Sequence, residues 1–183
     1  MIGEEDRKEL IRIARRAAEE AVRGGAFRPD GPPPEGPLGE NRGAFVTLTR
    51  EGRLRGCIGL VVADRPLLRV VAEMGAAAAR DDPRFSPVRE EELPALRIEI
   101  SALTPLEEVR SPEEIRIGRD GLLIRKGARS GLLLPQVAER EGWDPKRFLD
   151  ETCRKAGLPA GAWSDEDATV ERFGAEVWGE EEE

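Results

Sequence analysis

Apolar residues recur at helical spacing in several parts of the chain. The pattern predicts an amphipathic helix over residues 4–23 and a second helix over 66–80, for which Asp64 is the expected N-cap. Two shorter helices are expected over 135–141 and 145–156, each opened by a proline. The first helix is expected to lie at the surface, and the small residues Gly75–Ala79 of the second permit close packing against a sheet.

Alternation of apolar and polar residues predicts strands elsewhere. Residues 44–49 and 54–62 alternate on either side of Glu51-Gly52, a dipeptide that favours a tight hairpin turn. Further strands are expected over 97–103, 115–117, 122–125, 131–134 and 169–178. Hairpins interrupted by helices at irregular intervals predict an α+β fold, with a mostly antiparallel sheet flanked by helices.

Two segments fall outside this pattern. Residues 28–43 are rich in proline and glycine, which predicts a long loop, more easily explained as an extended connector than as a lid. Residues 179–183 end in a run of glutamates and are expected to form a solvated acidic tail. The length of 183 residues suits one domain, or one domain with a small second lobe.

The charge and the termini limit the partners and the location. The net charge is −8, from 29 basic and 37 acidic side chains spread along the chain, so neither a nucleic acid nor an anionic membrane is an expected partner. The chain has no leader-like segment and no long apolar run, which predicts a cytoplasmic protein. Its two cysteines do not form a secreted disulfide framework.

The chain contains no histidine and no tyrosine. A Ser-His-Asp triad, a Cys-His dyad and a histidine-ligated metal are therefore excluded within this chain. Two cysteines are also too few for a four-cysteine zinc site. We expect no metal site and no cofactor.

One predicted strand has an unusual composition. Between Leu54 and Gly59 it contains Gly56 and Gly59, and these two glycines flank Cys57. Glycine inside a strand often marks a place where a ligand or another backbone comes close, so a partner group is expected to reach Cys57. With a period of two residues, Arg55 and Cys57 are expected to lie on the same face.

Polar residues of neighbouring strands extend this candidate site. If the strands share one sheet, a single polar patch is expected to contain Thr47, Thr49, Arg55, Cys57, Glu99 and Ser101. In this hypothesis Cys57 is the candidate nucleophile and Glu99 a second candidate catalytic residue. Arg55, Gly56, Gly59, Thr47 and Ser101 are the candidate binding residues. The alternative is that Cys57 is a small buried apolar residue, as free cysteines often are.

Without histidine, only a cation or backbone dipoles can activate the thiol, and Arg55 is the nearest cation in sequence on the expected face. Arg55 is therefore expected to lower the pKa of Cys57, unless Glu99 pairs with it. Other groups have structural interpretations: Cys153 has the spacing of a helical core residue, and residues 126–131 resemble a hairpin turn more than a phosphate-binding loop.

Several motifs together resemble the AMMECR family, whose bacterial members are named protein A of the AmmeMemoRadiSam system. The motifs are Arg53-Leu-Arg-Gly-Cys-Ile-Gly59, Asp82-Pro-Arg-Phe85, Ile98-Glu-Ile-Ser101, Gly131-Leu-Leu-Leu-Pro-Gln-Val137, Gly142-Trp-Asp144, Phe148-Leu149 and Thr152-Cys-Arg-Lys-Ala-Gly157. The resemblance covers about residues 44–178. It implies a single domain of two unequal lobes, a suspected site at the Leu54–Gly59 stretch, and a Memo-like protein and a radical-SAM protein as partners.

Three functions are compatible with these observations. The first is cysteine-dependent chemistry at Cys57, performed together with the Memo-like and radical-SAM partners. The second is a non-catalytic binding or scaffold module that recognises a peptide or a small anion. The third is a redox sensor, which needs only an exposed thiol.

Overall fold

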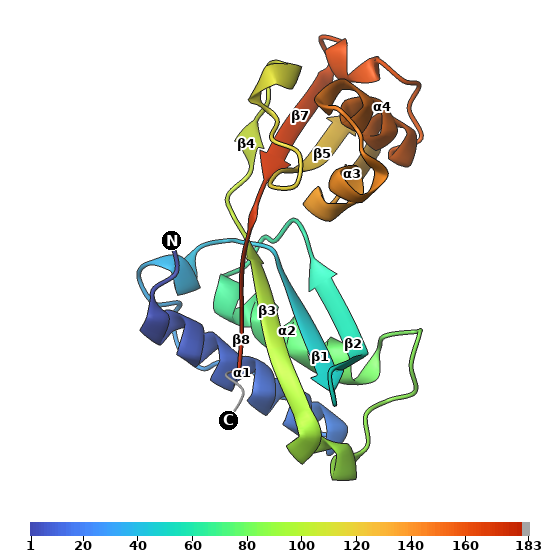
Figure 1. The fold of residues 1–183 in the computed structure, drawn as a ribbon. Coiled ribbons are helices and arrows are strands. Elements are labelled where there is room, and N and C mark those ends of the chain that lie inside the picture. Colours follow the sequence, from blue (N-terminus) through green and yellow to red (C-terminus); the bar gives the residue numbers. More distant parts are fainter. Residues whose placement is uncertain (181–183) are drawn as a thin grey trace. The chain divides into compact units, whose positions relative to one another are not determined.

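The computed structural model describes residues 1–180 and divides the chain into two compact units (Figure 1). Unit 1 contains residues 1–103 and the C-terminal segment that begins at Glu176, and unit 2 contains residues 104–175. Each unit has its own four-stranded antiparallel sheet. The predicted α+β fold class is confirmed.

Unit 1 is a sheet with two long helices on one face (Figure 1). The strand order is β2-β1-β3-β8. Its elements are α1 (Glu4–Val22), β1 (Ala44–Arg50), β2 (Arg53–Leu60), α2 (Leu67–Arg80), β3 (Leu96–Leu103) and β8 (Ala175–Gly179), with the short 3₁₀ helices η1 (Pro37–Gly39) and η2 (Glu90–Ala95). The sheet face opposite α1 and α2 is called the open face below.

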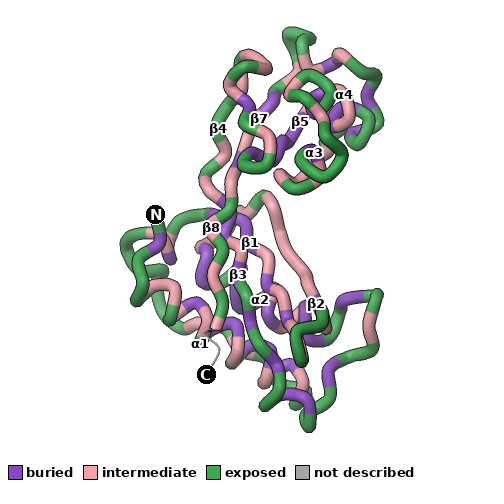
Figure 2. Tube along the Cα trace, in the orientation of Figure 1, coloured by how far each residue is buried: buried purple, intermediate pink, exposed green. Residues whose placement is uncertain are grey.

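Burial alternates along the central strands, as the sequence pattern predicts. Ala44, Val46 and Leu48 of β1 are fully buried, and the two residues between them, Phe45 and Thr47, are partly exposed (Figure 2). In β3, Ile98 and Ile100 are buried in the same core. Because both strands bury one face against the helices, their polar residues are directed to the open face.

The predicted hairpin is present and closes at Glu51-Gly52. Both turn residues have positive φ, 52° and 72°, which is the conformation that a two-residue hairpin turn requires. The pairing of β1 with β2 shifts by one residue after Leu48, so that Leu48 lies opposite Gly56 and Thr49 opposite Leu54. Arg55 is therefore the extra residue of a β-bulge.

Two local predictions in unit 1 need correction. Helix α2 begins one residue later than expected, and its N-cap is Pro66 rather than Asp64. The Asp64 carboxylate instead accepts a hydrogen bond from Arg65. The proline-rich segment is irregular apart from η1 and one bridge between Asn41 and Pro66.

Unit 2 packs two helices against a sheet of order β4-β7-β5-β6. Its elements are β4 (Glu107–Glu108), η3 (Pro112–Glu114), β5 (Gly121–Lys126), β6 (Arg129–Leu133), α3 (Pro135–Glu141), α4 (Pro145–Lys155), η4 (Ala162–Ser164) and β7 (Ala168–Phe173). The turn between Lys126 and Arg129 is the predicted hairpin turn. Cys153 is fully buried with Phe148 and Leu149, which confirms its prediction as a core residue.

Two strand predictions in unit 2 are wrong. Residues 115–117 form no strand, because they follow η3 directly and lead into a turn. The single strand expected over 169–178 is two strands, β7 and β8, which belong to different sheets and are separated by Gly174. Next to this break, the amide of Thr104 donates to the Gly174 carbonyl over 2.9 Å, and the Gly174 amide donates to Thr104 Oγ1 over 2.8 Å.

The expected acidic tail is only partly described. Glu180 is not a free surface residue, because its carboxylate pairs with Arg15 at 2.6 Å and accepts the amide of Ile98. Residues 181–183 lie outside the described part of the chain. Within residues 1–180, no helix is both long enough and apolar enough to cross a bilayer.

Candidate functional site around Cys57

The expected polar patch begins with a row across three strands of unit 1. Thr47 of β1 lies opposite Cys57 of β2 on one side and opposite Glu99 of β3 on the other. Residues opposite each other in an antiparallel pair direct their side chains to the same face. Cys57, Thr47 and Glu99 therefore form one row on the open face, as expected if the strands share a sheet.

A second row lies beside the first one. Phe45 of β1 is flanked by Gly59 and by Ser101. Phe45 and Ser101 are both half-buried. The open face thus presents a thiol, two hydroxyl groups, a carboxylate and an aromatic ring within two neighbouring rows.

The sulfur of Cys57 has a hydrogen-bond donor next to it. Thr47 Oγ1 donates to Cys57 Sγ over 3.3 Å, and both side chains are half-buried. A donated hydrogen bond stabilises a thiolate more than a thiol, because the thiolate carries the negative charge. Cys153, by contrast, is fully buried, and this burial raises the pKa of its thiol.

The backbone of Cys57 is held by side chains from the segment after α2. Because β2 is an edge strand, the outward amide and carbonyl of Cys57 have no strand partner. The amide donates to Asp82 Oδ2 over 2.8 Å, and the carbonyl accepts from the Arg84 guanidinium over 3.3 Å. Asp82 and Arg84 thus take the place of a neighbouring strand at this one residue.

Asp82 and Arg84 are also bound to each other. Their closest N–O distance is 2.6 Å, and the Asp82 side chain is buried. The Arg84 guanidinium, by its hydrogen bonds, holds the pKa of Asp82 well below its usual range. Asp82, through its hydrogen bond, raises the pKa of Arg84. The Arg84 guanidinium is therefore a cation held at the backbone of Cys57.

Arg55 does not have the place that simple alternation predicts. The bulge interrupts the period of two residues, and the Arg55 guanidinium donates to Glu92 over 2.9 and 3.0 Å. It also donates to the backbone carbonyls of Ser86 and Pro87. The expected pairing of Arg55 with Cys57 or with Glu99 is replaced by this ion pair with a buried carboxylate.

Each glycine of the stretch has a neighbour within unit 1. A Cβ on Gly56 would lie 2.1 Å from the Ala78 carbonyl oxygen of α2, and a Cβ on Gly59 would lie 2.1 Å from the Phe45 ring. Gly56 thus permits close packing of the helix on the sheet, and Gly59 gives room to an aromatic ring. The close approach inferred from these glycines is internal to the fold.

The residues missed from the sequence are Phe45, Asp82 and Arg84. The Asp82-Pro-Arg-Phe85 motif was a usable signal. It places two opposite charges on either side of a proline, directly after the predicted helix ends. Its contact with Cys57 spans 25 residues and is not readable from local periodicity. Among residues 1–180, no three His, Cys, Asp or Glu side chains come together as a metal site would require.

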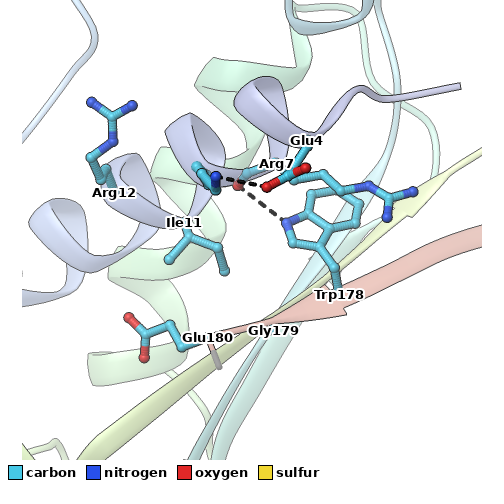
Figure 3. Close-up of a pocket in the computed structure, with 8 residues that line it drawn as sticks. Glu4, Arg7, Ile11, Arg12, Trp178, Gly179 and Glu180 are labelled. Atoms are coloured by element: carbon cyan, nitrogen blue, oxygen red, sulfur yellow. Dashed lines mark hydrogen bonds and ion pairs between the residues drawn. The ribbon is translucent and has the colours of Figure 1, made fainter. Parts of the chain in front are cut away.

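A groove lies at the edge of the unit 1 sheet opposite to β2, between α1 and β8 (Figure 3). Its volume is about 740 Å³. Trp178 forms part of its wall, and the indole N–H donates to the backbone carbonyl of Arg7. The groove contains no thiol, so the chemistry expected of Cys57 has no counterpart there.

The two cysteines are expected to react differently with iodoacetamide. In native protein at neutral pH, Cys57 should be alkylated, because it is half-exposed and has Thr47 and Arg84 beside it. Cys153 should react only after denaturant is added, because it is fully buried and its pKa is raised. Mass mapping of tryptic peptides measures both rates. Equal rates in native protein would contradict this prediction.

Comparisons with known proteins give the family. The AMMECR1 family profile matches residues 11–178. A protein from Thermococcus onnurineus is 50% identical over 184 residues, covering 94% of this chain and 89% of the relative, and one from Methanothermobacter thermautotrophicus is 44% identical, covering 98% and 97%. The crystal structure of the uncharacterised protein PH0010 from Pyrococcus horikoshii is similar with a TM-score of 0.74 and 46% identity, over 94% of this chain and 90% of that one. The chain belongs to the AMMECR1 family.

Proposed function

We propose that this protein performs cysteine-dependent chemistry, with Cys57 as the nucleophile on the open face of unit 1. The observation that carries the proposal is the hydrogen bond from Thr47 Oγ1 to Cys57 Sγ at 3.3 Å, at a residue whose carbonyl accepts from the Arg84 guanidinium. A thiol that only fills space needs neither a donor nor a cation. The same two groups are what a thiolate nucleophile requires when no histidine is present.

The proposed step uses the groups of the first row. The thiol proton leaves to solvent, a sulfur lone pair forms a bond to an electrophilic atom of the substrate, and the leaving group departs with its bonding pair. Asp82 and Arg84 hold the Cys57 backbone, so the sulfur keeps one position during attack. Glu99 lies beyond Thr47, about 10 Å from Cys57 between Cα atoms, since each strand spacing is about 4.8 Å. In this proposal Glu99 exchanges a proton with the substrate rather than with the thiol.

Removing the Thr47 hydroxyl should slow the reaction of Cys57. Thr47→Val keeps the shape of the side chain and removes the donor, and we expect alkylation by iodoacetamide at neutral pH to slow about tenfold. The matched control is Thr49→Val, since Thr49 is on the same strand and face but pairs with Leu54 instead of Cys57. The measurement is the pseudo-first-order rate for Cys57 in each variant. If both variants react like the unaltered protein, the donor does not tune the thiol.

A second candidate function is a non-catalytic binding module for a peptide or a small anion. The observation that favours it is the half-buried Phe45 ring over Gly59, which adds an apolar surface beside the Thr47 and Ser101 hydroxyl groups. The two functions differ in their need for sulfur. Cys57→Ser would abolish the proposed chemistry and leave such binding intact.

The partners and the location are part of the proposal. The resemblance stated above suggests a Memo-like protein and a radical-SAM protein as the proteins that act together with this chain. A cytoplasmic setting suits it, because thiols there stay reduced.

A further inference from the structure

A pocket of about 480 Å³ lies in unit 1 between the start of the proline-rich loop and the first half of α2. The segment around the start of the loop contributes Phe27, Arg28 and Pro29 to its wall. Arg65 and, from the helix, Arg69, Ala72 and Glu73 complete the wall. This end of α2 is remote from Ala78, where the helix packs on Gly56 of the Cys57 strand. The pocket is therefore separate from the candidate site on the open face.

The charges that line this pocket are predominantly positive. Arg65 is neutralised, because it pairs with Glu73 at 2.9 Å and with Asp64 at 2.9 Å. Arg28 and Arg69, in contrast, have no carboxylate within 4.0 Å anywhere in residues 1–180. Within the described part of the chain, the Arg69 guanidinium donates one hydrogen bond, to the Gly31 carbonyl over 3.4 Å.

A further arginine reinforces this charge. Arg16 of α1 stacks over the Phe27 ring, 4.4 Å from its centroid, and it too has no carboxylate partner within residues 1–180. The chain as a whole carries a net charge of −8, and Arg65 shows that the same helix end can pair an arginine with carboxylates. Arg28 and Arg69 both line the cavity, whereas Arg16 adds its charge through Phe27. Unpaired guanidinium groups that line one cavity repel each other, and an anion between them removes this repulsion.

We propose that this pocket binds a phosphorylated small molecule. Arg28 and Arg69 would hold the phosphate, because planar guanidinium groups match phosphate oxygens with paired hydrogen bonds. Phe27, Pro29 and Ala72 would contact an apolar part of the ligand. The volume exceeds the size of a free phosphate ion and falls within the range of pockets for small organic ligands.

The proline-rich loop would position one of the two phosphate-binding arginines. Proline has a fixed φ, so Pro29 limits the conformations of the backbone next to Arg28. The contact of Arg69 with the Gly31 carbonyl joins the loop to the helix from the other side. The loop and the helix thus each hold one arginine in the pocket wall before any ligand arrives, which lowers the entropy cost of binding.

The test is a calorimetric titration of the full chain with phenyl phosphate at constant ionic strength. We expect saturable binding of one molecule per chain, and an increase in Kd of about tenfold or more in the double variant Arg28→Gln/Arg69→Gln. The matched control is Arg53→Gln/Arg97→Gln, which removes two arginines of unit 1 that likewise have no carboxylate partner within residues 1–180 and do not line the pocket. Its Kd should stay within about twofold of the unaltered protein, because only general charge is lost.

Three outcomes would overturn the proposal. The first is the absence of saturable heat at millimolar phenyl phosphate. The second is an equal loss of affinity in both double variants, which would indicate general electrostatics. The third is equal affinity for phenyl phosphate and for neutral phenol, which would show that the phosphate is not recognised. Cys57→Ser should bind phenyl phosphate like the unaltered protein, so failure here and failure of the cysteine chemistry are distinguishable.

Discussion

Replacing Glu92 with glutamine is expected to lower the free energy of unfolding by about 3 kcal/mol at neutral pH. The Glu92 side chain is buried and accepts hydrogen bonds from Arg55, Arg50 and the Arg89 amide. Chiefly through the Arg55 hydrogen bond, these donors lower its pKa from 4.5 to about 2. Each pKa unit corresponds to about 1.4 kcal/mol of preference for the charged form, and glutamine has the same shape without the charge.

The same ion pair makes stability depend on pH in a defined window. Because the folded-state pKa lies below the unfolded value, the contribution of Glu92 is complete above about pH 4.5 and is lost as the pH falls towards about 2. Urea denaturation across this window should show a flatter pH dependence for Glu92→Gln than for the unaltered protein. The control is Glu91→Gln, because Glu91 is an exposed neighbour whose ion pair with Arg89 lies at the surface. Equal stability of the two variants at every pH would contradict this account.

Replacing Gly56 with alanine should destabilise unit 1 by about 3 kcal/mol or more. The new Cβ would lie 2.1 Å from the Ala78 carbonyl oxygen, which belongs to the backbone of α2 and cannot rotate away. Either the helix or the strand must move, and overpacking of this kind in a close-packed core has a large cost. Urea denaturation followed by circular dichroism measures the change.

Gly59→Ala is the matched comparison for Gly56→Ala. Here the new Cβ also meets an atom at 2.1 Å, but that atom belongs to the Phe45 side chain, which is only half-buried. Adding Phe45→Ala should restore much of the stability lost in Gly59→Ala, whereas no side-chain truncation should rescue Gly56→Ala. If Gly56→Ala is as stable as the unaltered protein, the helix does not pack on β2 as closely as the structure shows.

Most of unit 1 could be predicted from local sequence, because its central strands β1 and β3 each bury one face. The alternation in β1 and β3 correctly assigns Thr47, Glu99 and Ser101 to one side. In β2 the bulge at Arg55 breaks the period, and its place depends on how β2 pairs with β1, which a single strand does not encode. Arg84, which donates to the Cys57 carbonyl, comes from 27 residues away.

A similar limit explains the wrong strand at the C-terminus. Residues 169–178 alternate almost without a break, so nothing in the period marks the change from β7 to β8. Before Gly174 the chain pairs with β4 and β5, and after Gly174 it pairs with β3. These partners are known only once both sheets are assembled. The family resemblance, in contrast, depends on exact motifs and was readable over most of the chain.

The hydrogen bonds between Thr104 and Gly174 have a consequence for the order of folding. They join the two ends of an inserted segment of about 70 residues, and closing a disordered loop of that length costs about 4 kcal/mol in chain entropy. If unit 2 folds first, its internal contacts offset this loss of entropy. The start of β8 then lies next to the end of β3, and pairing the two strands requires little further loss of chain entropy. We therefore expect β8 to be the last strand to join its sheet, and the rate of that step to follow the folding rate of the insert.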